Sequence, residues 1–271
     1  MNLFSKKMPG IMMVLVSLFY SVSAMSQSAE ELARTAQNPV ASMISLPFQN
    51  NTNFNFGPGE DTQNVLNIQP VIPFSMGENW NLITRTIIPV ISQPGFTPEQ
   101  GRKNGLGDIQ LSTFISPKEV GASGWIWGAG LVAQFDTATN DRLGAGAFGL
   151  GPSAVLLKPF GPWMVGALIN NIWSVSTDRN DVNMFLLQPF INYNFPDKPG
   201  RYLTFAPIIT ANWEADSGNV WTVPLGLGIG QVTRFGKQPV NMQASAYYNV
   251  KKPDFGADWQ LRLQLQLMFP K

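Results

Sequence analysis

The residue types that most often carry catalysis are missing from this chain. Its 271 residues include no histidine and no cysteine, so neither an imidazole general base nor a thiol nucleophile is available. A serine activated by lysine or a pair of carboxylates remains open, but the chain has no G-x-S-x-G nucleophile elbow. We therefore expect no enzyme, no metal site and no cofactor, since histidine and cysteine are also leading metal ligands.

A few charged and amide side chains are instead suited to lining a polar passage. Arg85, Asp108 and Arg262 are the main charges on the polar faces of the predicted strands, and five amides share those faces: Gln134, Gln188, Gln243, Gln260 and Gln264. One hypothesis is a pore-lining constriction that selects small polar or anionic solutes. The alternative is that Arg85 pairs with Asp108 on the adjacent predicted strand and fills a narrow barrel.

The last predicted strand shows how such side chains would be positioned. From Trp259 to Phe269 apolar residues alternate with mostly polar ones, the period-2 pattern of a strand with two different faces. The aromatic residues at its two ends stand ten positions apart. A strand of an outer-membrane barrel crosses the hydrocarbon in about 9–11 residues, with aromatic girdles at both interfaces. Length and ends therefore favour lipid over the core of a soluble sandwich.

The same pattern recurs along the chain and predicts an all-β transmembrane antiparallel up-and-down β-barrel. Trp163 and Trp173 bracket another one-sided apolar row. About 12 strands fit, an even number as in single-chain bacterial barrels: 41–54, 64–74, 80–92, 105–116, 125–136, 147–158, 163–174, 182–195, 202–213, 220–235, 239–250 and 258–269. Compact turns alternate with longer loops, as periplasmic turns alternate with outer loops in such barrels.

Six prolines fall inside these predicted strands: Pro70, Pro89, Pro152, Pro189, Pro207 and Pro224. Proline has no N–H to give to a neighbouring strand, and a closed barrel has no edge strand to shelter it. We therefore expect these prolines to lie at bulges, to bend the wall locally or to shorten particular strands.

The first 24 residues have the pattern of an export signal. Lys6 and Lys7 precede an apolar run that starts at Ile11, and small residues lead to Ala24, as in a cleaved signal peptide. The 14 residues from Ile11 to Ala24 fall short of the roughly 20 that span a membrane as a helix. We expect residues 1–24 to be a signal peptide cleaved after Ala24, with Ala29 as a second cleavage site.

Residues 25–40 form a separate element before the barrel, which we place at 41–271. Ser28 and Glu31 have capping-box spacing, and Pro39 would stop a helix. We expect a short periplasmic N-terminal helix or ordered tail. The alternative is a helix that plugs or gates the lumen.

Six segments resemble a known family: 37–54 (QNPVASMISLPFQNNTNF), 63–74 (QNVLNIQPVIPF), 80–91 (WNLITRTIIPVI), 105–108 (GLGD), 208–218 (IITANWEADSG) and 236–241 (GKQPVN). The chain is similar to a bacterial outer-membrane transporter family related to the meta-pathway phenol-degradation protein group, some of whose members carry the misapplied title neuromedin U. The resemblance covers nearly all of the chain after the signal peptide. It implies a barrel that passes small aromatic or hydrophobic compounds, and it supplies no catalytic or binding residues. Many barrels end in an aromatic residue, whereas here Pro270 and Lys271 follow Phe269.

Together these observations predict a passive channel or facilitator for small molecules in the cell outer membrane. Its expected partners are outer-membrane lipid, a small-molecule solute and the barrel-assembly machinery. Without residues 1–24 the chain has 16 basic and 17 acidic side chains, a balance that argues against nucleic acid as a partner. The alternatives are a closed structural or binding barrel and, less favoured, an outer-membrane enzyme.

Overall fold

The computed structural model describes residues 28–97, 99–175 and 181–270. The expected signal peptide, residues 1–24, lies outside the described residues. Within the described part of the chain, no helix has the length and apolar character needed to cross a membrane. The fold is all-β, with a short helix, α1 (Ala29–Ala36), before the first strand.

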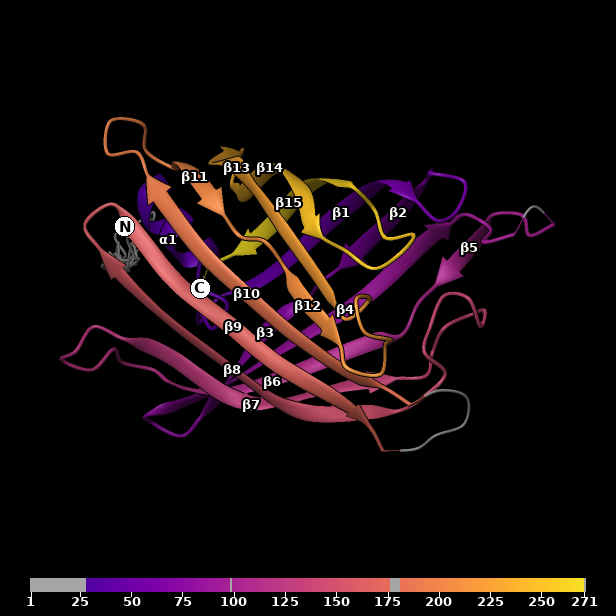
Figure 1. Ribbon diagram of the computed structural model, residues 1–271. Coiled ribbons are helices and arrows are strands. Elements are labelled where there is room, and N and C mark those ends of the chain that lie inside the picture. Colours follow the sequence, from indigo (N-terminus) through magenta and orange to yellow (C-terminus); the bar gives the residue numbers. More distant parts are fainter. Residues whose placement is uncertain (1–27, 98, 176–180, 271) are drawn as a thin grey trace, which may run out of the picture.

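The strands form a closed antiparallel barrel (Figure 1). The residues that the structure describes supply 12 wall strands, as the alternation predicts. The first strand pairs with the last from Ile44↔Phe269 to Phe54↔Trp259 without a register shift, so the wall has no free edge. Three wall strands are interrupted, and the segments are β1 (Ile44–Phe56), β2 (Asp61–Ile68), β3 (Val71–Met76), β4 (Trp80–Gln93), β5 (Lys103–Leu106), β6 (Ile109–Pro117), β7 (Ile126–Phe135), β8 (Gly149–Phe160), β9 (Trp163–Ser174), β10 (Asn183–Asn194), β11 (Arg201–Phe205), β12 (Ile209–Asn212), β13 (Trp221–Phe235), β14 (Gln238–Lys251) and β15 (Trp259–Phe269).

The prolines of the predicted strands lie where the pairing is interrupted. Pro70 separates β2 from β3, and Pro207 lies between β11 and β12. Pro189 of β10 faces this second gap, because β10 pairs with β12 up to Leu187 and with β11 only from Ile191. A proline at such a place takes no hydrogen bond away from the neighbouring strand.

The other three prolines show the same relation. Pro224 stands at a register shift between β13 and β14, and Pro152 falls between the paired residues of β8 and β9. Pro89 lies opposite the gap between β5 and β6, where its carbonyl accepts the N–H of Gly107 at 2.9 Å. The expectation of bulges and shortened strands is confirmed, and it explains why three predicted strands are split.

The two faces of the wall carry opposite kinds of side chain in β15. Its outward-facing Leu263 is 48% exposed, whereas the neighbouring Arg262 is 2% exposed. Trp163, Ile169 and Trp173 of β9 also point outward, as their spacing predicts. The outer surface is therefore a broad apolar band, larger than a soluble monomer usually exposes.

Aromatic side chains gather at both ends of this band. At one end, the rings of Trp80 and Trp127 lie 5.9 Å apart, edge to face. At the other end, the rings of Tyr248 and Trp259 lie 4.8 Å apart. Two girdles around an apolar band are typical of barrels that cross an outer membrane.

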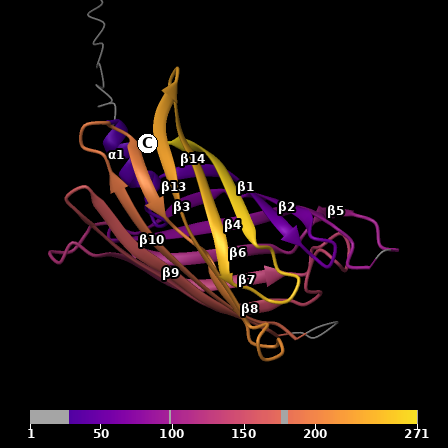
Figure 2. The same cartoon turned by 45° about the horizontal axis from the view of Figure 1, so that its top comes forward.

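The connections differ between the two ends of the barrel. Tight turns at 161–162 and 236–237 lie at the same end as α1 and the C-terminus (Figure 2), which we call the turn end. The long connections from β4 to β5 and from β7 to β8 start at the other end, the loop end, where the short connection 57–60 is an exception. In bacterial barrels the short turns face the periplasm.

Candidate functional site

The residues before the first strand form a folded element. Ser28 caps α1, because its hydroxyl accepts the N–H of Glu31 at 3.1 Å, as the capping-box spacing predicts. Acidic residues in the first turn and Arg34 in the last turn complement the helix dipole. After the helix the chain runs on to β1 without further regular structure. We call residues 29–43 the lumen segment.

One face of α1 packs on the inner surface of the barrel. Leu32 and Ala33 have no exposed surface, and they belong to a buried cluster with Tyr202, Val232 and Met268. Those three residues point inward from β11, β13 and β15. The helix therefore lies inside the barrel, against its inner surface.

Side-chain hydrogen bonds tie the rest of the lumen segment to two different strands. Gln37 and Asn194 of β10 exchange hydrogen bonds at 2.8 and 3.2 Å. Asn81 of β4 donates to the hydroxyl of Ser42 at 2.8 Å. Because both partners stand at the turn end of their strands, the lumen segment crosses the barrel interior at that end.

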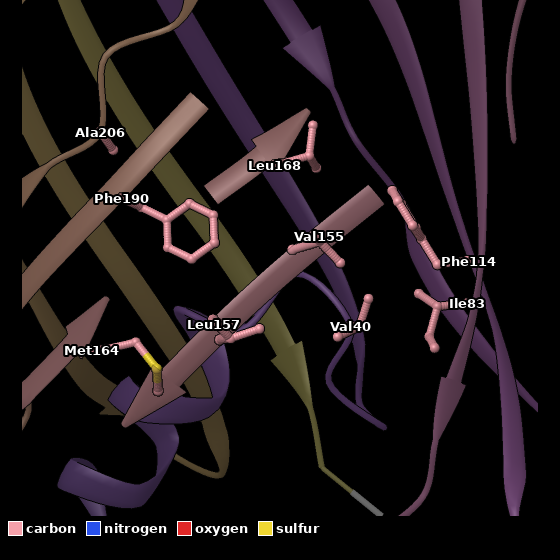
Figure 3. Close-up of a cluster of buried hydrophobic side chains, with 9 residues drawn as sticks. All are labelled: Val40, Ile83, Phe114, Val155, Leu157, Met164, Leu168, Phe190 and Ala206. Atoms are coloured by element: carbon pink, nitrogen blue, oxygen red, sulfur yellow. The ribbon is translucent and has the colours of Figure 1, made fainter. Parts of the chain in front are cut away.

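One side of the lumen has an apolar surface. Inward-facing residues of β4, β6, β8, β9 and β10 form a buried cluster around Val40 of the lumen segment, and Ala206 joins them (Figure 3): Ile83, Phe114, Val155, Leu157, Met164, Leu168 and Phe190. Residues that alternate with them, such as Leu156 and Ile169, face outward and are apolar too. We call this surface the apolar wall.

The other side of the lumen is lined by side chains that bond to one another. The buried hydroxyl of Tyr202 donates to Asn241 Oδ1 at 2.8 Å, and Asn241 donates to Gln266 Oε1 at 3.1 Å. Gly230 leaves room for the Tyr202 ring, since a Cβ atom there would lie 2.1 Å from it. Mutual pairing avoids the free-energy cost of a buried polar group without a partner. We call this surface, formed by β1, β11, β14 and β15, the polar wall.

Arg262 is the charged centre of the polar wall. Its Nε donates to Asn51 Oδ1 at 3.1 Å and its Nη1 to the Ala206 carbonyl at 2.9 Å. Its Nη2 donates to Gln260 Oε1 at 3.1 Å. The guanidinium also lies over the Tyr247 ring, 4.8 Å from the ring centroid. All three oxygen partners are neutral, so among the residues that the structure describes the guanidinium has hydrogen-bond partners but no acidic side chain paired with it.

Arg85 of β4 also points into the lumen. Its Nε donates to Gln69 Oε1 at 3.2 Å, whereas its Nη1 makes no hydrogen bond with any residue that the structure describes. Arg262 lines the same part of the lumen as Arg85. Two like charges in one space raise the electrostatic free energy of the lumen.

A cavity of about 160 Å³ lies between the lumen segment and the two walls. Arg85 and Arg262 are the charged residues among its 25 lining residues, and none of those 25 is acidic. Leu168 and Phe190 are among the apolar residues that line it, and ten of the 25 are amides. The cavity therefore combines positive charge, hydrogen-bonding groups and an apolar side.

Five of the residues that we expected in the lumen surround this cavity: Arg85, Gln188, Gln243, Arg262 and Gln264. Gln260 stands beside it, bonded to Arg262. Gln134 is buried further toward the loop end, where it accepts a hydrogen bond from Gln110.

Arg85 and Asp108 do not form the predicted ion pair. The carboxylate of Asp108 accepts three backbone N–H groups of the 136–148 loop, at 2.6 to 3.2 Å. The register explains the separation, because Arg85 pairs with Ser112, four residues from Asp108, which is about 13 Å along a strand. Asp108 therefore holds a loop at the loop end and does not line the cavity.

The apolar wall was not predicted from the sequence, although the sequence contains a pattern for it. Residues 154–157 and 185–187 are apolar on both faces, which is typical of strands covered on both sides. No such local pattern predicts the position of the lumen segment inside the barrel. It depends on contacts such as Gln37 with Asn194, which are 157 residues apart.

Solved structures with a similar fold exist. The crystal structure of an outer membrane channel from Pseudomonas putida F1 is 18% identical to this chain, with a TM-score of 0.64 over 86% of this chain and 96% of that one. This chain shares its barrel fold. Outer membrane phospholipase A from Escherichia coli is 14% identical, with a TM-score of 0.48 over 91% of this chain and 99% of that one. No protein-family model and no curated protein sequence matches the chain.

Proposed function

We propose that the chain is an outer-membrane channel or facilitator for small molecules, within the transporter family that its sequence resembles. In this proposal the signal peptide directs export, the barrel-assembly machinery inserts the barrel, and the apolar band contacts outer-membrane lipid. The barrel fold shared with an outer membrane channel supports the proposal.

The observation that carries the proposal is the division of the lumen into an apolar and a polar wall. A solute with an apolar body leaves water for the surface around Phe190 and Leu168, where burial stabilises by about 25 cal/mol per Å². Its polar group exchanges water for the amides and arginines opposite. Passage of this kind needs only a concentration gradient, and it suits small compounds with a ring or short chain and a polar group.

Passage requires the lumen segment to move. The segment is held by the packing of Leu32, Ala33, Val40 and Met43 and by side-chain hydrogen bonds to three turn-end positions, whereas every wall strand is hydrogen-bonded along its length to two neighbours. Elements with fewer buried contacts open at lower free energy than the rest of a fold. The segment can therefore leave while the barrel stays closed, which makes it a gate.

Liposome swelling tests the channel. Phenylalanine and glucose are similar in size and cross protein-free bilayers poorly, but only phenylalanine has an apolar ring. We expect vesicles that contain the barrel to swell faster in phenylalanine than in glucose. If the open state is populated at about 1–10%, deletion of residues 29–43 raises both rates roughly 10- to 100-fold.

Point variants on α1 provide the matched control. Leu32→Asn places a polar group in the buried contact and is expected to raise swelling, whereas Glu31→Gln on the exposed face leaves the rate unchanged. Heat-modifiable migration on gels reports whether each barrel is folded. Folded wild-type and deletion proteins that both swell no faster than empty vesicles would refute the channel.

A closed binding barrel is the second candidate, because the lumen segment fills the turn end. It predicts no swelling even after the deletion. A lipid-hydrolysing enzyme is less favoured, since the chain has no histidine to serve as a general base. Hydrolysis of lipid by the purified, refolded barrel would support the enzyme over the channel.

A further inference from the structure

We propose that the lumen cavity is a binding site for small monocarboxylates with an apolar body about the size of one aromatic ring, the carboxylate being held by Arg85 and Arg262. The inference rests on the proposed function in one respect, that such compounds are the solutes that pass. Binding itself requires no passage.

The positive charge of the cavity favours an anionic ligand. Two arginines line one cavity, and none of its lining residues is acidic. Taking a charge out of water costs free energy unless an opposite charge compensates it. The neutral oxygens around Arg262 satisfy hydrogen bonds only. A bound carboxylate supplies the missing negative charge.

The Arg85 guanidinium offers a hydrogen-bond donor to a ligand in the cavity. A guanidinium has five N–H groups in a planar fork that matches a carboxylate. Arg85 directs Nε and Nη2 to Gln69 Oε1, while Nη1 has no partner among the described residues. Gln69 thus holds the orientation of the Arg85 side chain and leaves one amino group available to a ligand.

The apolar side of the same cavity favours a ligand with an apolar body. Phe190 and Leu168 line it, and Ala206 joins the two surfaces. The side chain of Ala206 belongs to the apolar cluster, whereas its carbonyl accepts a hydrogen bond from Arg262. An apolar cavity of about 150 Å³ accommodates benzene, and this cavity measures about 160 Å³. A single ring that carries a carboxylate matches both its size and its chemistry.

Isothermal titration calorimetry on the folded full chain in detergent tests the site with three probes. Benzoate has the ring and the charge, benzamide has the ring without the charge, and acetate has the charge without the ring. We expect benzoate to bind about tenfold tighter than either of the others. Arg85→Gln is expected to weaken benzoate binding about tenfold and to leave benzamide binding unchanged.

Two further variants keep the test independent of folding. Arg85→Lys retains the charge and is expected to recover part of the benzoate affinity. Arg102→Gln removes an arginine at the loop end and is expected to change nothing. Heat-modifiable migration shows that each variant is folded before it is titrated.

Each alternative outcome would contradict one part of the proposed binding site. Equal affinity for benzoate and benzamide, full benzoate affinity in Arg85→Gln, or no benzoate binding to the wild type overturns the carboxylate site. Equal affinity for acetate and benzoate overturns its apolar half. If swelling persists while benzoate binding fails, the channel stands without this site. If benzoate binds while no vesicle swells, the site stands without the channel.

Discussion

The two walls of the lumen are alike outside and different inside. Leu263 of the polar wall is 48% exposed on the outer surface, and Leu156 of the apolar wall is 46% exposed there. On the inner surface β15 presents Arg262, whereas β8 presents Val155 and Leu157. In the proposed channel, lipid constrains only the outer face of each strand. The inner face is then constrained by the packing of the lumen segment and by the solute.

We expect the largest loss of unfolding free energy from a substitution in the apolar wall. Phe190→Ala empties space in the buried cluster and is expected to lower the free energy of unfolding by about 3–5 kcal/mol, measured by denaturant titration in detergent. It also removes apolar surface from the cavity, so the preference for phenylalanine over glucose in liposome swelling is expected to fall.

The neighbouring residue provides the control for the apolar wall. Ile191 follows Phe190 on β10 and faces outward, 38% exposed. Ile191→Ala is expected to cost about 1 kcal/mol and to leave the swelling preference unchanged. Equal effects of the two substitutions would show that the inner surface of β10 has no special part in stability or selection.

A smaller effect is expected in the polar wall. Tyr202→Phe removes the hydroxyl that donates to Asn241 and leaves a buried acceptor unsatisfied, at about 1–2 kcal/mol of unfolding free energy. Tyr248→Phe, on the outer surface, is expected to have no effect. A loss in Tyr202→Phe as large as that in Phe190→Ala would remove the difference between the walls, because hydrogen bonds would then contribute as much stability as packing.

The smallest effect is expected outside both walls, at the loop between β14 and β15. A hydrogen bond from Lys252, then one from Asn55, holds the pKa of the Asp258 carboxyl below its usual value. The ion pair is therefore present above pH of about 4 and is lost as the pH falls through the lowered pKa. Because the pair is exposed, its contribution is small.

Amide hydrogen exchange of residues 252–258 checks this dependence. At pH 6 Asp258→Asn is expected to exchange faster than the wild type, and at low pH the difference is expected to vanish. A difference that persisted in acid would show that the substitution acts through packing and not through charge.

The barrel itself could be predicted from the sequence, and the interior only in part. Period-2 alternation from Trp259 to Phe269 specifies one strand and its two faces, because neighbouring side chains of a strand point in opposite directions. Prolines such as Pro207 marked the interruptions, because proline cannot complete a ladder.

The arrangement inside the barrel depends on register and on contacts between distant residues. Arg85 and Asp108 lie on adjacent wall strands, but four residues of register separate them. Val40 meets Phe114 and Leu168 only because the lumen segment turns into the barrel. No local pattern encodes either relation.

In the proposed channel, the lumen segment closes a passage between the apolar wall and the polar wall. The chain has no cysteine, so Gln37→Cys with Asn194→Cys introduces a single reactive pair where two side chains now exchange hydrogen bonds. Linking the pair with a short thiol reagent that reduction cleaves is predicted to bring phenylalanine swelling down to the level of empty vesicles, and reduction is predicted to restore it. Swelling at the full rate with the segment linked would contradict the claim.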